Sequence, residues 1–163
     1  MMVYHIPTVY LIIGILYVLL PLTVWALLYS QPVRSVALWC LGGELLGIGL
    51  LWVGLRAHLP AWVTYPLANA VMWTGVLIQI MALRRALEQS LALKRSALLI
   101  VVGVAGFEFF RVVLQDAILR FSWSILIFSV LFAYVAYLAW RIAGVHQLKS
   151  AKWLSVVYVR SEE

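Results

Sequence analysis

Several polar and charged side chains lie inside long apolar stretches, and their types could support chemistry or ligand binding. They are Glu44, Asn69, Glu108, Arg111, Gln115 and Asp116. A charge at the centre of an apolar segment that crosses a membrane costs roughly 3 kcal/mol on insertion scales. Such a group must be neutral, paired or directed into a polar cavity. We therefore treat these residues as a candidate intramembrane polar site.

Glu44 lies near the middle of an apolar segment, with Cys40 and Gly47 on the same helical face. It could be an acid that senses a ligand or a proton, or that couples to an ion. It could equally be a carboxyl group satisfied by a neighbouring helix. Asn69 lies on one face with Tyr65 and Trp73, where an interhelical hydrogen bond or a ligand contact would explain it.

Glu108 and Arg111 are spaced i, i+3, so they can pair within one helix. Gln115 continues that face, and Asp116 and Arg120 are spaced i, i+4 beyond it. One interpretation is a polar cavity that opens to the outside of the membrane. The other is an intrahelical ion pair whose only effect is to lower the cost of placing two charges in a membrane-spanning helix.

Signatures of known catalytic and metal sites are missing from the sequence. There is no H-E-x-x-H, no G-x-S-x-G, no phosphate loop and no G-x-G-x-x-G motif. Cys40 is the only cysteine, and the histidines His5, His58 and His146 are far apart in the chain. We therefore expect no enzymatic activity, no cofactor and no metal ion.

The composition indicates which elements position these residues. Hydrophobic residues make up 66% of the chain and charged residues 11%, against about 45–50% and 25% in soluble domains. A membrane-spanning helix needs about 20 apolar residues. We predict an all-α, polytopic transmembrane helix bundle over residues 1–150 and a short cytoplasmic tail over 151–163. The predicted spans are 9–28, 36–55, 62–83, 97–119 and 123–143.

The distribution of lysine and arginine predicts the orientation. Of the 12 basic residues, nine follow the first, third and fifth segments, and only Arg56 and Arg120 lie on the opposite side. The positive-inside rule then places the N-terminus outside and the C-terminus in the cytoplasm. The net charge of +6 forms no basic stripe with interleaved aromatic residues, so we expect no nucleic-acid partner.

Glycines in the second segment predict close helix packing. Gly43 and Gly47 form a small-x-x-x-small pattern. For these glycines, packing within the subunit is favoured over dimerisation. The expected partners of the chain are the lipid bilayer and either a second copy or another membrane subunit. No internal repeat is visible, which gives no support to an inverted-repeat transporter.

The stretch from Trp39 to Leu87 contains a recognisable pattern of tryptophan, small, proline and arginine residues: Trp39, Gly42, Gly47, Gly49, Arg56, Leu59, Pro60, Trp62, Ala68, Asn69, Leu83, Arg84 and Arg85. With these residues the stretch resembles the N-terminal membrane modules of many bacterial diguanylate cyclases and some sensor kinases. The resemblance extends to the preceding helix and the basic tail, and so to most of the chain. Those modules commonly have seven or eight spans and a cytoplasmic GGDEF or kinase domain, whereas this sequence has no GGDEF motif, which suggests a truncated module without cyclase activity.

The resemblance implies a sensory or signal-transducing input module in a bacterial cytoplasmic (inner) membrane, with an unknown ligand. Such a module would act by helix rearrangement. Two other classes of function are compatible with the residues. One is a small transporter or channel component that uses the intramembrane carboxylates, and the other is an accessory subunit of a larger membrane complex.

Overall fold

The computed structural model describes residues 6–28, 34–91 and 93–160, and these residues form helices joined by short connections. Five of the helices in these described residues are long and apolar enough to cross a membrane. The prediction of an all-α chain with five such segments is confirmed within these residues. The elements are α1 (Ile6–Leu27), α2 (Arg34–Gly54), the π-helical turn η1 (Val63–Leu67), α3 (Ala68–Ala86), α4 (Leu93–Glu108), the π-helical turn η2 (Phe109–Val113) and α5 (Ala117–Arg160).

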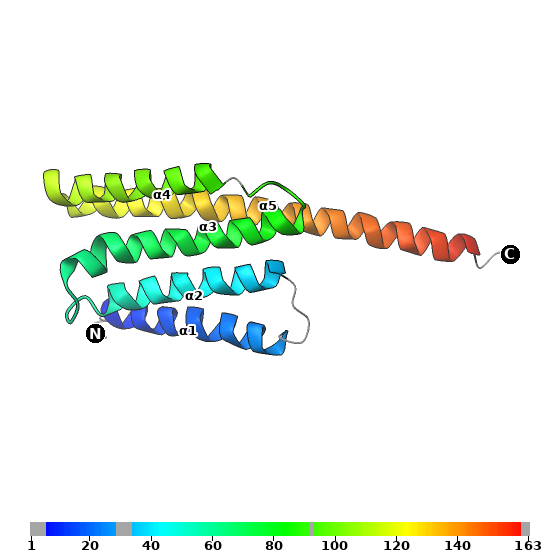
Figure 1. Ribbon diagram of the computed structural model, residues 1–163, viewed down its shortest axis with the longest axis horizontal. Coiled ribbons are helices and arrows are strands. Elements are labelled where there is room, and N and C mark those ends of the chain that lie inside the picture. Colours follow the sequence, from blue (N-terminus) through cyan, green and yellow to red (C-terminus); the bar gives the residue numbers. More distant parts are fainter. Residues whose placement is uncertain (1–5, 29–33, 92, 161–163) are drawn as a thin grey trace, which may run out of the picture.

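The helices run roughly along one direction, with α3 at the centre (Figure 1). α1 packs on α2 alone among the described helices, α2 packs on α3, and α4 and α5 pack on the other side of α3 and on each other. We call the end with the α2–η1 loop and the α4–α5 turn the turn end. The opposite end, from which α5 extends beyond the other helices (Figure 1), is the tail end.

Glycines on two faces of α2 allow both of its neighbours to approach closely. A Cβ added to Gly42 would lie 2.5 Å from the carbonyl oxygen of Gly75 in α3. On the other face, a Cβ on Gly43 would lie 2.5 Å from the ring of Pro21, and Gly47 also contacts α1. The glycine pair singled out in the sequence therefore packs within the subunit, and α1 continues as a helix through Pro21.

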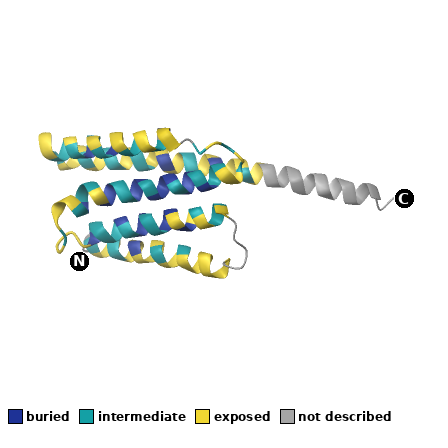
Figure 2. Cartoon of the chain, in the orientation of Figure 1, coloured by how far each residue is buried: buried dark blue, intermediate teal, exposed yellow. Residues whose placement is uncertain are grey.

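The core lies along α3, which holds more of the buried residues than any other described helix (Figure 2). Trp73 is fully buried and makes edge contacts with Phe107 at 6.5 Å and with Phe128 at 6.4 Å between ring centroids. By contrast, α1 exposes large apolar side chains along most of its length, for example Leu20. Such a surface has no favourable partner in water, whereas lipid chains would cover it.

The boundary between α4 and α5 differs from the expected one. The fourth segment was expected over 97–119, but the helix ends at Val113 and α5 begins at Ala117. Asp116 Oδ1 accepts hydrogen bonds from the backbone N–H groups of Ile118 and Leu119, at 2.7 and 3.0 Å. This side chain caps the first turn of α5, and Gln115 has a positive φ of 51°.

A short cytoplasmic tail was expected over residues 151–163, and the structure describes most of these residues as a continuation of α5. α5 continues as helix through residue 160, and residues 161–163 lie outside the described part of the chain. The apolar segment within α5 is Ala117–Gly144, so the last part of the helix extends past it.

Candidate functional site

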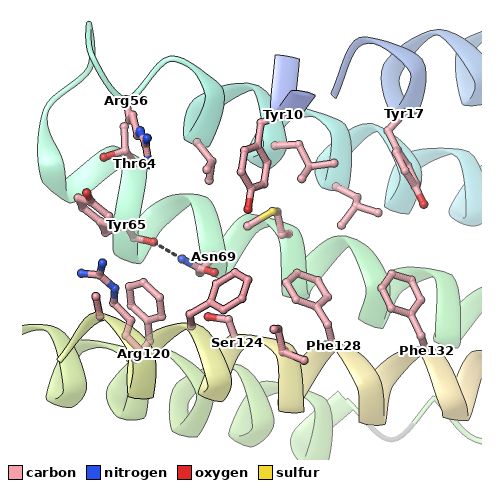
Figure 3. A pocket seen from close by; sticks show the side chains of 18 residues that line it. Tyr10, Tyr17, Arg56, Thr64, Tyr65, Asn69, Arg120, Ser124, Phe128 and Phe132 are labelled. Carbon is pink, nitrogen blue, oxygen red and sulfur yellow. Dashed lines mark hydrogen bonds between the residues drawn. The ribbon is translucent and has the colours of Figure 1, made fainter. Parts of the chain in front are cut away.

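A cavity of about 560 Å³ lies between α1 and α2 on one side and α5 on the other (Figure 3). Residues of η1 and α3 form its floor. Its volume is within the range of roughly 300–1,000 Å³ that is typical of small-molecule sites. The cavity therefore has the size to hold one small ligand.

Two arginines line the turn end of this cavity (Figure 3). Arg56 belongs to the loop after α2, and Arg120 belongs to the first turn of α5. The guanidinium carbon of Arg120 lies 5.0 Å from the ring centroid of Tyr65 and 5.8 Å from that of Phe107. These aromatic contacts hold Arg120 without neutralising it, and in the described residues neither arginine forms an ion pair.

The rest of the cavity is mostly apolar. On α5, the lining residues Arg120, Ser124, Phe128 and Phe132 follow one another at i+4 spacing and so lie on one helical face. Met72 of α3 and leucines of α2 complete the apolar part. The cavity is therefore cationic at the turn end and apolar toward the tail end.

Besides the arginines, the lining residues with polar side-chain groups are Tyr10, Tyr17, Thr64, Tyr65, Asn69 and Ser124. The side-chain amide of Asn69 donates a hydrogen bond to the carbonyl oxygen of Tyr65 at 2.7 Å. The buried hydroxyl of Ser124 has no hydrogen-bond partner among the described residues. None of the lining residues is Asp, Glu, His, Cys or Lys. The arrangement can bind an amphipathic anion, and it offers no acid–base pair for bond chemistry.

Asn69 and Glu44 both lie in helices as expected, but only Asn69 lines the cavity. Asn69 lines the cavity, although its hydrogen bond is made within its own helix and not to a neighbouring one. Glu44 is half-buried in α2 outside this cavity, and one of its carboxylate oxygens is buried without a hydrogen-bond partner in the described residues. Trp73, on the face shared with Asn69, belongs to the core.

Glu108 and Arg111 form the expected ion pair. Nε of Arg111 donates to both carboxylate oxygens of Glu108 at 2.9 Å, and the side chains of Arg111 and Glu108 are 28% and 26% exposed, respectively. Arg111 also lies over the ring of Tyr65, at 5.9 Å from its centroid. The pair does not line the cavity, but Arg111 contacts Tyr65, which does.

Gln115 and Asp116 are not part of a polar stripe within a membrane-spanning helix. Both lie in the turn between η2 and α5, where Gln115 is exposed and Asp116 caps the helix. Asp116 and Arg120, which are spaced i, i+4, form no side-chain ion pair in the described residues; the backbone N–H of Arg120 donates to the carbonyl oxygen of Asp116 at 3.2 Å. A short polar turn between two apolar helices explains why both residues interrupted one long apolar stretch.

Sequence reasoning did not include Arg56 and Arg120 among the candidate site residues. Arg56 was counted as a loop charge and as a residue of the resemblance, and Arg120 as a loop charge and as the residue four positions after Asp116. The i+4 series that begins at Arg120 and continues through Ser124 to Phe132 was a usable signal. Tyr65 was noticed for its spacing to Asn69, and the structure adds that its ring lies against two guanidinium groups.

A second cavity of about 390 Å³ lies between α4 and α5 and is lined by apolar residues and Trp123. It has no charged side chain. Within the part of the chain that the structure describes, no three His, Cys, Asp or Glu residues are grouped so that they could hold a metal ion. His5 and the side chain of His146 lie outside that part.

Comparison of the chain with protein-family models, with curated proteins and with solved structures finds no match.

Proposed function

We propose that this chain is the membrane-embedded sensory module of a signalling protein of the bacterial inner membrane. The observation that carries the proposal is the continuity of α5. This helix begins at the cavity and continues for 44 residues, past the end of its apolar segment at Gly144. At 1.5 Å per residue it is about 66 Å long, against about 30 Å for the apolar core of a bilayer. In this proposal, one continuous helix connects a ligand-sized cavity to the far side of the membrane.

The mechanism we infer is a displacement of α5 relative to α3 when the cavity is filled. Near the turn end, α5 contributes Arg120 and Ser124 to the cavity. Nearer the tail end, the hydroxyl of Tyr134 on α5 accepts a hydrogen bond from Nη1 of Arg84 on α3, at 2.9 Å. Small helix shifts of about 1–2 Å are a common form of such transitions. A shift at the cavity would therefore change the register of α5 at the tail end.

In this proposal the turn end faces the outside and the tail end faces the cytoplasm. Nine of the 12 basic residues follow the first, third and fifth apolar segments, which supports this orientation. Reporter fusions at Gln89 and after Lys152 are expected to report the cytoplasm, and a fusion at Ala57 the outside. Gln89 found outside would exclude a cytoplasmic output.

A cavity-filling substitution tests the mechanism without knowledge of the ligand. Ser124→Trp places an indole in the cavity, and Ser122→Trp, at an exposed position two residues earlier on α5, is the matched control. Spin labels at Ala86 and Gly144, in a Cys40→Ala background, report the distance between α3 and α5.

We expect Ser124→Trp to shift the label distance by about 1–2 Å and Ser122→Trp to leave it unchanged. Circular dichroism and thermal unfolding of both variants show whether the bundle is intact. An intact Ser124→Trp variant with the wild-type distance would contradict coupling between the cavity and α5.

A transporter component is the second candidate function, and the buried carboxylate oxygen of Glu44 favours it. That atom has no hydrogen-bond partner among the described residues, as expected of a group that binds a proton or an ion in transit. A proton or sodium flux in liposomes that is lost in Glu44→Gln would support this alternative. Absence of flux from liposomes that hold folded protein would exclude it.

A further inference from the structure

We propose that the cavity binds an amphiphile with one aliphatic chain and an anionic head group, of the class of the long-chain fatty acids. The head group would lie between Arg56 and Arg120, and the chain would extend along the apolar part toward Phe132. This inference names the ligand class for the sensory module proposed above, and it concerns the same site.

The charge of the lining residues selects the head group. Arg56 and Arg120 bring two positive charges to the turn end of the cavity, and no acidic residue lines it. Arg120 is half-buried and is held in place by aromatic rings, so its donors remain available to a ligand. A guanidinium group binds carboxylate or phosphate oxygens through two parallel hydrogen bonds. An anion would therefore be favoured, and a cation would be repelled.

The shape of the cavity selects the chain. The two arginines lie at one end of the cavity, whereas Phe128 and Phe132 lie toward the other (Figure 3). A volume of about 560 Å³ suits one aliphatic chain with its head group, since sites for small molecules reach roughly 300–1,000 Å³. The cavity is charged near the end of the helices and apolar toward their middle. An amphiphile in one leaflet of a bilayer has the same orientation, with its head group at the surface and its chain toward the middle.

Photolabelling of the full chain tests the proposal. The protein is placed in nanodiscs of phosphatidylcholine and labelled with a palmitate analogue that carries a diazirine on its chain, and the labelled residues are located by mass spectrometry. Palmitate, hexadecanol and phosphatidylglycerol are compared as competitors. They differ in head-group charge and in the number of chains, so the competition separates a free fatty acid from a phospholipid of the bilayer.

We expect labels on α5 between Ser124 and Phe132, competition by palmitate and little competition by hexadecanol. Arg120→Gln and Arg56→Gln should each weaken labelling by about tenfold or more, while Arg120→Lys, which keeps the charge, should lose less. Arg141→Gln is the matched control, since Arg141 also lies on α5 over an aromatic ring, 6.0 Å from the centroid of Tyr137, but outside the cavity.

Three results would overturn the proposal. Equal competition by hexadecanol and palmitate would show that the head-group charge is not recognised. Wild-type labelling in both arginine-to-glutamine variants would show the same. Stronger competition by phosphatidylglycerol than by palmitate would assign the cavity to a two-chain phospholipid. The wild-type competition series needs no variant, and labelling measures occupancy and not α5 movement, so the ligand class and the sensory function can fail separately.

Discussion

The guanidinium group of Arg120 lies over the ring of Tyr65, 5.0 Å from its centroid, and so joins the first turn of α5 to the π-helical turn that precedes α3. The same ring lies 5.9 Å from the guanidinium carbon of Arg111 in η2. Tyr65 therefore connects both π-helical turns of the described chain to the charged end of the cavity. Single π-helical turns are often found at functional sites.

A double-mutant cycle on Tyr65 and Arg120 should measure a coupling free energy of about 0.5–2 kcal/mol, the range for a cation–π contact that is partly removed from water. The variants are Tyr65→Leu, Arg120→Gln and the double substitution, and the measurement is reversible unfolding in mixed micelles with SDS. Tyr65→Phe keeps the ring and should stay near the wild type. The exposed pair of Tyr137 and Arg141 is the control. Coupling no larger than in that pair would mean that the ring does not hold Arg120.

Asp116→Ala should destabilise the protein by about 1 kcal/mol, because the cap of α5 is lost. Asp116→Asn should retain most of the stability, since its side-chain oxygen can still accept from the backbone N–H groups of Ile118 and Leu119. If Asp116 acted instead through its charge on Arg120, Asn and Ala would be equally destabilising. Thermal unfolding of the three proteins in detergent distinguishes these outcomes.

Gly42→Ala and Gly75→Ala should each destabilise the bundle, because either Cβ would lie 2.5 Å from a carbonyl oxygen of the facing helix. Contacts of that kind force the helices apart, and overpacking of a core typically costs about 1–3 kcal/mol. Gly144→Ala is the matched control, since a Cβ there meets nothing within 4 Å. The control should be neutral or slightly stabilising, because alanine favours helix over glycine. Wild-type unfolding of Gly42→Ala would show that α2 and α3 are not in close contact in the membrane.

Glu44→Gln should preserve membrane expression and folding, whereas Glu44→Lys should impair both. The half-buried carboxyl group lies in the interior of α2, at a depth where a cation costs roughly 3 kcal/mol. Membrane fractionation and size-exclusion chromatography in detergent measure the difference. Equal yields of monodisperse protein for both variants would indicate that the carboxyl group faces water.

The sequence predicts the features of this fold that depend on local pattern. Each apolar segment is long enough to form a membrane-spanning helix by itself, and the pair of Glu108 and Arg111 follows from a spacing of three residues within one helix. The α4–α5 turn was expected between residues 119 and 123, too late in the sequence, because its stop signal is the cap made by Asp116 and not a glycine or a proline. Asp116 thus looked like one more charge in a long apolar stretch.

The cavity could not be predicted, because it depends on the order in which the helices pack. α1 contacts α2 alone among the described helices, which leaves space between α1 and α5 that no local pattern reveals. Arg56 and Arg120 are 64 positions apart in the sequence. They share the cavity only because α3 places the end of α2 and the start of α5 at the same end of the bundle.

The central claim is that occupancy of the cavity moves α5, and a distance measurement on the full chain tests it most directly. Spin labels at Ala86 and Gly144, in a Cys40→Ala background, are followed in phosphatidylcholine nanodiscs as palmitate is added. We predict a shift of about 1–2 Å that saturates with palmitate binding and is lost in Arg120→Gln. A label distance that stays constant while photolabelling shows the cavity to be filled would contradict the account.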